Sequence, residues 1–147
     1  MRRKDTKKSV HLSDINNSLI FIYHVDGSIL GHRITNSILI AACLQCRIHD
    51  TSNSLLSLSI PNHPVIENCK QLVFSNADTD DISVFENRKS QSEHSQPNMC
   101  FDVKDFHWFQ RSHSPHWEEG SLQSYVNTHD DVSALFKRLP DVLSPSN

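Results

Sequence analysis

The chain repeats one short pattern four times: Leu12-Ser-Asp-Ile-Asn-Asn-Ser-Leu19, Gly31-His-Arg-Ile-Thr-Asn-Ser-Ile38, Ile48-His-Asp-Thr-Ser-Asn-Ser-Leu55 and the shorter Ile66-Glu-Asn-Cys-Lys-Gln-Leu72. Equivalent residues are spaced 19, 17 and 18 residues apart, namely Ile15, Ile34, Thr51 and Cys69. This period is too short for helical repeat units of ~33–34 residues. It fits one coil of a β-solenoid, whose short strands are joined by turns of Asn, Ser and Asp. The sequence therefore predicts an all-β fold, a parallel β-helix (solenoid), with an ordinary antiparallel sandwich as the alternative.

Apolar and polar residues alternate within each repeat, as expected for strands with one buried face. Two columns of equivalent positions are predicted to point inward: Val10, Ile29 and Cys46, and then Leu12, Gly31, Ile48 and Ile66. The positions between them are predicted to point outward: His11, Leu30 and Arg47, and then Ser13, His32, His49 and Glu67. Together with Ile15 and Ile34, the apolar inward residues form the predicted core.

A length of 147 residues bounds the chain to one domain with extensions. We expect a basic disordered tail at residues 1–8, a solenoid domain at 9–119, and a polar tail at 120–147 with a short helix at 131–139. Residues 76–98 read as a polar insert that is poorly ordered, because few apolar side chains offset the entropy cost of ordering it. Trp108 and Trp117 are expected to clamp the C-terminal segment onto the solenoid as a cap.

Composition excludes several functional classes. No stretch approaches the ~18–20 apolar residues of a membrane-spanning helix, and we expect no secretory signal at the N-terminus. The protein is therefore expected in the cytoplasm, with reduced thiols. A net charge of −3 argues against a nucleic-acid partner. Only three glycines are present, which excludes the Gly-rich loops that bind nucleotide phosphates.

Cysteine and histidine spacing does not favour a metal site. Cys43 and Cys46 form one close pair, but a structural zinc site needs a second pair, and Cys69 and Cys100 are far apart. The histidines around the Ser114-Pro turn lack the i, i+4 spacing of a zinc helix. We therefore expect neither a metal nor another cofactor.

Four motifs in order resemble the domain of tubulin-binding cofactor C. They are Cys43-Leu-Gln-Cys-Arg-Ile-His-Asp50, His63-Pro-Val-Ile-Glu-Asn-Cys69, Asp102-Val-Lys-Asp-Phe-His-Trp108 and Ser114-Pro-His-Trp117. The retinitis pigmentosa GTPase-activating protein and, more distantly, cyclase-associated proteins share this domain. The resemblance covers about residues 9–119 and implies a right-handed parallel β-helix, which agrees with the repeat.

The resemblance also implies a mechanism. Members that act on GTPases insert an arginine into the nucleotide site of the partner, and by motif position that arginine is Arg47. A guanidinium is always charged and planar, so it can neutralise charge on phosphoryl oxygens in the transition state. Glu67 matches a family glutamate and would hold Arg47 in a useful rotamer, while Gln45 matches a family glutamine that would contact the partner. The alternatives are a solvated arginine and a surface ion pair without a role.

Two functional classes follow from the resemblance. One is a GTPase activator in α/β-tubulin heterodimer assembly, associated with the cytoskeleton and acting on β-tubulin with cofactors D and E, or else on an Arf-like GTPase. The other is a non-catalytic cytoskeletal adaptor that keeps the fold. The chain departs from the family at Leu44, at Cys100 and in the polar insert, and we expect no stable membrane anchor. Either way, the chain is not an enzyme with its own active site.

Overall fold

The computed structural model describes residues 8–77, 102–130 and 134. Nearly all of the ordered elements in these ranges are strands, and every strand pairing is parallel. The elements are β1 (Lys8–Asn16), β2 (Leu19–Thr35), β3 (Ile38–His49), β4 (Ser52–Ser59), β5 (Val65–Glu67), β6 (Lys70–Asn76), β7 (Lys104–Asp105), β8 (Trp117–Glu119) and the helix α2 (Leu122–Thr128). No helix in the described ranges has the length and hydrophobicity needed to cross a bilayer.

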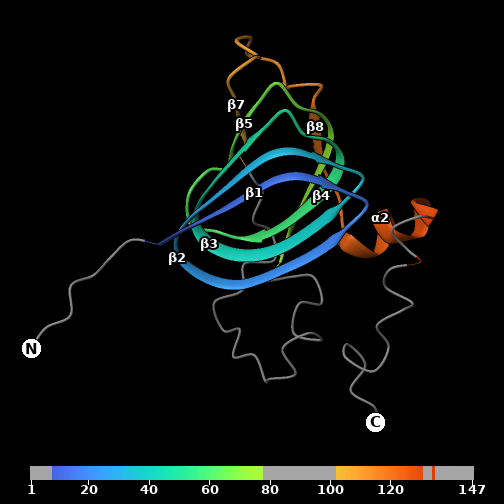
Figure 1. Cartoon of the computed structure of the whole chain (residues 1–147). Helices are drawn as coiled ribbons and strands as arrows, with labels where there is room; N and C mark the ends of the chain where they lie inside the picture. Colours follow the sequence, from blue (N-terminus) through green and yellow to red (C-terminus); the bar gives the residue numbers. More distant parts are fainter. Residues whose placement is uncertain (1–7, 78–101, 131–133, 135–147) are drawn as a thin grey trace, which may run out of the picture.

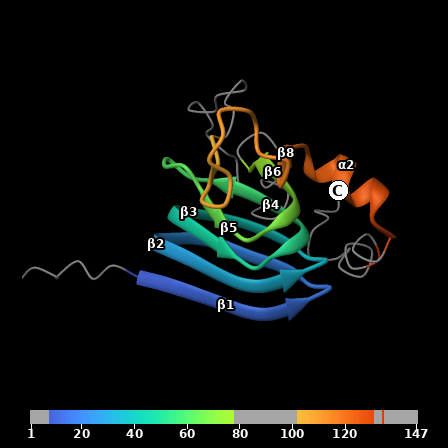
Figure 2. The ribbon, with the colours of Figure 1, turned by 90° about the horizontal axis from the view of Figure 1, so that it is seen from above.

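The strands wind into a β-solenoid of about four turns. Figure 1 looks along the stack of coils, and Figure 2 shows them from the side, with β1 at one end and β8 near the other. The register repeats the spacing read from the sequence, because Lys8 lies opposite Gly27, Leu30 opposite Arg47, and Arg47 opposite Val65. The predicted solenoid is therefore confirmed, and the antiparallel sandwich is excluded.

Each coil contributes strands to two main faces. The first face is formed by β1, the later halves of β2 and β3, and then β5 and β7. The second face is formed by the early halves of β2 and β3, followed by β4, β6 and β8. Irregularities in the β2–β3 register between Ile22 and Ser28 mark the place where the chain passes from the second face to the first.

The inward columns form the core as predicted. Ile29, Ile34, Ile48 and Ile66 are at most 1% exposed. Val10 and Leu12 pack against the same core but stay partly exposed, and so does Ile15. These three belong to the first coil, which has a stacked neighbour on one side only among the described residues.

Left-handed turn residues repeat in four consecutive coils. Eight residues have φ values of 49–58°, and they form two stacked columns: Asp14, Arg33, Asp50 and Asn68, and then Asn17, Asn36, Asn53 and Gln71. Asn and Asp tolerate this conformation better than most residues because their short polar side chains bond locally. None of the three glycines occupies such a position.

Hydroxyl side chains next to these turns connect consecutive coils. The Ser37 hydroxyl accepts a hydrogen bond from the Ser18 backbone N–H at 3.0 Å, and the Ser54 hydroxyl accepts one from the Ser37 N–H at 3.1 Å. The Thr51 hydroxyl likewise accepts a hydrogen bond from the Ile34 N–H at 3.2 Å. The repeated Asn-Ser pair thus has two physical roles: the Asn adopts the turn, and the Ser satisfies a backbone donor that the turn would otherwise leave unpaired.

The C-terminal part closes the solenoid. Trp117 is buried on β8 and meets Phe74 edge-on, with ring centroids 5.8 Å apart, which confirms the predicted clamp. Trp108 instead stays half-exposed and donates its indole N–H to the Ser112 carbonyl, so it closes its own loop. The helix α2 packs Leu122 and Tyr125 against the second face.

The boundaries of the C-terminal helix and of the polar insert differ from those predicted. The sequence did not predict α2, and the helix expected at 131–139 lies outside the described residues except for residue 134. Strand β6 includes Asn76, and Ala77 is fully buried, so the fold extends two residues into the expected polar insert. The rest of that insert, together with residues 1–7, lies outside the described residues.

The turn at Asn53 gives a test of the fold. At its φ of 51°, Ala is more strained than Asn. Replacing Asn53 with Ala should therefore destabilise the protein more than replacing it with Gly, by about 0.5–1 kcal/mol, because the relief of strain outweighs the extra freedom of unfolded Gly. Urea unfolding measures the difference.

Asn16 provides the control, because it lies at the end of β1 and its φ is not positive. There the ordinary order should hold, with the Gly variant less stable than the Ala variant. An Asn53→Ala protein as stable as Asn53→Gly would contradict the turn geometry.

Candidate functional site

The outer surface of the first face carries the side chains that the sequence singled out. Leu30, Arg47 and Val65 lie side by side on β2, β3 and β5. The next outward column contains Ser13, His32, His49 and Glu67. Since these columns follow the register, Arg47 and Glu67 share one face, as predicted.

Arg47 is exposed on β3. Its two neighbours across the strands, Leu30 and Val65, are apolar and offer its guanidinium no acceptor. Within the described ranges the Arg47 side chain forms neither a hydrogen bond nor an ion pair. The result is a cation held on a rigid strand without an intramolecular partner there.

Glu67 contacts a different residue from the one expected. It lies directly opposite His49, and its Oε1 is 3.5 Å from the His49 Nδ1. Both side chains are about 40% exposed, at 39% and 41%. Among the described residues, no ion pair joins Glu67 to Arg47, which lies diagonally across, two residues before His49. The structure thus brings the two residues onto one surface without pairing them.

Gln45 is exposed two residues before Arg47 on β3. Its Oε1 accepts a hydrogen bond of 3.3 Å from the Ser28 hydroxyl on the neighbouring coil. Gln45 therefore borders Arg47 on the same outer face and is oriented by the coil before it.

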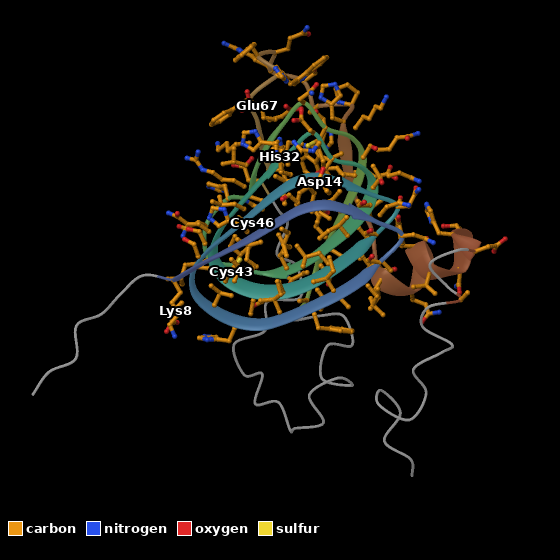
Figure 3. All side chains as sticks on the ribbon, in the orientation of Figure 1. Lys8, Asp14, His32, Cys43, Cys46 and Glu67 are labelled. Carbon is orange, nitrogen blue, oxygen red and sulfur yellow. The ribbon has the colours of Figure 1, made fainter. Side chains whose placement is uncertain are left out.

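The sequence did not predict the polar contacts at the corner beside this face. Figure 3 labels Glu67, His32 and Asp14 along this corner. His32 Nε2 lies 3.0 Å from Asp50 Oδ2, and Arg33 donates through Nη2 to Asp14 Oδ2 at 2.9 Å. The pKa of Asp50 is lowered by a hydrogen bond from the Asn68 amide and by its contact with His32. These polar residues recur at the spacing of the repeat, and that spacing is the sequence signal that could have predicted their contacts.

A second polar cluster lies where the inward column reaches its last coil. Asp105 has a side chain only 3% exposed, and its Oδ2 accepts from the Ser114 hydroxyl at 2.7 Å and contacts His116 Nδ1 at 2.6 Å. The His107 backbone N–H donates to Oδ1 at 2.9 Å. Burial raises the pKa of Asp105, but these hydrogen bonds outweigh burial and lower it.

This cluster contains Ser, His and Asp but does not form a nucleophilic triad. The Ser114 hydroxyl bonds to the carboxylate, whereas an activated serine bonds to the imidazole that takes its proton. The contacts instead tie the Asp-Phe-His-Trp motif to the Ser-Pro-His-Trp motif. The cluster is structural, because it joins the loop between β7 and β8 to the end of the solenoid.

The thiols are buried in the solenoid wall. Cys43, Cys46 and Cys69 are free, and Figure 3 labels the first two. A hydrogen bond between Cys43 and Cys46 lowers the pKa of Cys43 and, together with burial, raises that of Cys46. In the described part of the chain, no group of three or more His, Cys, Asp or Glu side chains is arranged to hold a metal ion.

These features define a class of protein: a β-solenoid that presents polar side chains on the outer surface of one face. The family described as Tubulin binding cofactor C has a model that matches residues 4–106. The chain belongs to that family, so the resemblance read from its four motifs is confirmed.

Known relatives agree with this assignment. The chain is 27% identical over 112 residues to the tubulin-folding cofactor C of Arabidopsis thaliana, covering 76% of this chain and 32% of the relative. It is 27% identical over 105 residues to human tubulin-specific chaperone C, covering 67% of this chain and 30% of the relative. The chain thus spans about a third of the length of the curated relatives it matches.

A solved structure has the same fold. Tubulin Binding Cofactor C from Leishmania major superposes with a TM-score of 0.54 at 20% identity. The match covers 84% of this chain and 90% of that one. At this identity the likeness establishes the solenoid fold alone.

The Asp105 cluster makes a prediction about stability and pH. Asp105→Asn should destabilise the protein at pH 7 by about 1.5–3 kcal/mol, the range for hydrogen bonds to a charged group. A carboxylate with a lowered pKa stabilises the fold above its unfolded pKa of about 3.9 and loses that contribution as the pH falls through its folded pKa. The difference between wild type and variant should therefore shrink as the pH falls below about 4. Urea unfolding at several pH values measures it.

Asp102→Asn is the matched control. Asp102 is 64% exposed and contacts only surface groups, His63 and Lys104, among the described residues. Its loss should change stability by less than about 1 kcal/mol. An equal effect of the two substitutions at pH 7 would refute the structural role of Asp105.

Proposed function

We propose that this chain is a tubulin-folding cofactor that activates GTP hydrolysis by β-tubulin during α/β-tubulin heterodimer assembly, with Arg47 supplied in trans as an arginine finger. Membership of the tubulin binding cofactor C family supports the tubulin-folding role. The observation that carries the finer proposal is the exposed guanidinium of Arg47, held between two apolar neighbours without a partner in the described part of the chain. The proposed partners include cofactors D and E, and the proposed site of action is the cytoplasm, at the cytoskeleton.

The proposed mechanism assigns the chemistry to the partner. The nucleotide and the attacking water belong to the GTPase, and this chain supplies one cation to the transition state. A guanidinium can bond to phosphoryl oxygens through several N–H groups and neutralise the charge that develops on them. A finger supplied in this way accelerates hydrolysis by ~10³–10⁵.

The rigid strand contributes to this effect. Arg47 lies in the middle of a parallel sheet whose register fixes its backbone. Docking of the face therefore brings the Arg47 backbone to one place, with little loop ordering needed. Gln45 borders the finger and would contact the partner, while Glu67 is near enough on the next strand to orient it.

Substitution of Arg47 tests the proposal. Arg47→Ala should fold normally, because an exposed side chain between apolar neighbours contributes little packing. It should reduce stimulated GTP hydrolysis by about 10³-fold or more. Arg47→Lys should also largely fail, because an ammonium cannot make the planar multidentate contact. Glu67→Ala should be milder, because the finger remains. The measurement is GTP hydrolysis by tubulin with cofactors D and E, beside the same assay with an Arf-like GTPase.

Lys70→Ala serves as the charge-matched control, because Lys70 is exposed at the start of β6, away from the first face. It should leave stimulation unchanged. Equal stimulation by wild type and Arg47→Ala, with both folded by circular dichroism, would refute the finger and favour a non-catalytic adaptor. If the chain stimulates the Arf-like GTPase but not tubulin, the partner is an Arf-like GTPase instead of tubulin.

A further inference from the structure

Glu67 has two basic neighbours on β3, and it contacts the one that sequence reasoning left without a role. His49 lies directly opposite Glu67, whereas Arg47 lies opposite Val65, two residues earlier. Strand spacing of ~4.8 Å and a two-residue rise of ~6.6 Å place the Arg47 and Glu67 Cα atoms ~8 Å apart. A long arginine side chain can span that diagonal, so both basic residues have access to the same carboxylate.

The two contacts compete for the same carboxylate. An arginine pairs most strongly with a carboxylate through two parallel hydrogen bonds that use both oxygens. In the structure, His49 Nδ1 lies 3.5 Å from Oε1 of Glu67. A charged His49 at Oε1 would therefore compete with Arg47 for one of the two oxygens that this pair uses.

Within the described ranges, the only carboxylate at ion-pair distance from His49 is that of Glu67. The titratable or charged side chains that face it are Arg47 and Asp50 along its own chain segment, His32 from β2 and Glu67 from β5. Asp50 is occupied by His32 at 3.0 Å and by the Asn68 amide. The His32 and His49 rings meet edge-on, with centroids 6.1 Å apart. His32 therefore has its own acidic partner, and among the described residues His49 forms its ion pair with Glu67.

The His49–Glu67 contact is also adjustable. A separation of 3.5 Å is longer than the 2.7–3.2 Å of a well-formed hydrogen bond. Histidine is the side chain that changes its charge near neutral pH. A protonated imidazole binds a carboxylate strongly through a charge-assisted hydrogen bond, whereas a neutral one binds it weakly.

We propose that His49 is a positioning residue that competes with Arg47 for Glu67, so that the charge on His49 sets how well Glu67 can orient the finger. This inference rests on the proposed role of Arg47. A charged His49 holds Glu67 and leaves the guanidinium undirected. A neutral His49 leaves Glu67 available to Arg47.

Substitutions at His49 test the competition in both directions. His49→Thr suits a strand and carries no charge, and should raise stimulated hydrolysis about two- to fivefold at pH 6.5, the range of an exposed ion pair. His49→Lys carries a fixed charge and should lower stimulation at every pH. The ratio of wild-type to His49→Thr stimulation should rise with pH.

A double-mutant cycle with Glu67→Gln identifies the route of the effect. If His49 acts through Glu67, then His49→Thr should have no effect in the Glu67→Gln background. His32→Thr is the matched control, because His32 lies in the same column with a similar exposure of 44% but pairs with Asp50. It should leave stimulation and its pH dependence unchanged within twofold.

The outcomes separate this inference from the proposed function. If Arg47→Ala stimulates as well as wild type, the proposed function falls and the competition falls with it. If Arg47→Ala is inactive but His49→Thr has the same effect with and without Glu67, or at all pH values, only the competition is refuted. Circular dichroism and urea unfolding confirm that each variant is folded. A loss of stimulation by His49→Thr that follows its loss of stability would likewise overturn the inference.

Discussion

Every coil of this solenoid must turn its corner at the same place as the coil before it, and the rest of the structure depends on that constraint. Two stacked columns of left-handed residues make the turns, and most of these residues are Asn or Asp. The hydroxyls of Ser37, Ser54 and Thr51 then accept hydrogen bonds from backbone N–H groups of the preceding coil. Without these hydroxyls the corners would leave buried donors unpaired, at a cost of about 1–3 kcal/mol each. The register is therefore fixed at the corners and carried along the strands.

A fixed register converts sequence spacing into a surface. Residues 17–19 positions apart become neighbours, so the outward positions of successive coils form a column of side chains on the surface. Arg47 has apolar neighbours in its column, so its guanidinium has no partner among the described residues, whereas the next column places His49 opposite Glu67. The register that stacks the apolar side chains in the core thus also determines which charged side chains on the first face can contact one another.

Much of this could be read from the sequence, because the repeat states the register directly. The period predicted which residues stack, and alternation predicted that Ile48 points inward while Arg47 and Glu67 point outward. Contacts between side chains were harder to predict. Spacing placed both Arg47 and His49 within reach of Glu67, and only side-chain geometry shows which one it contacts. The helix α2 was missed because its stability comes from packing Leu122 and Tyr125 on the second face, a tertiary effect that its short polar sequence does not reveal.

The central claim is that Arg47 enters the nucleotide site of a GTPase partner. The most direct measurement is a structure of the complex with the partner bound to GDP and aluminium fluoride, which imitates the phosphoryl group in transit. The account predicts the Arg47 guanidinium within hydrogen-bond distance of the fluoride, about 2.7–3.2 Å, with the first face of the solenoid against the partner. A complex in which another face docks, or in which Arg47 stays in solvent away from the nucleotide, would contradict it.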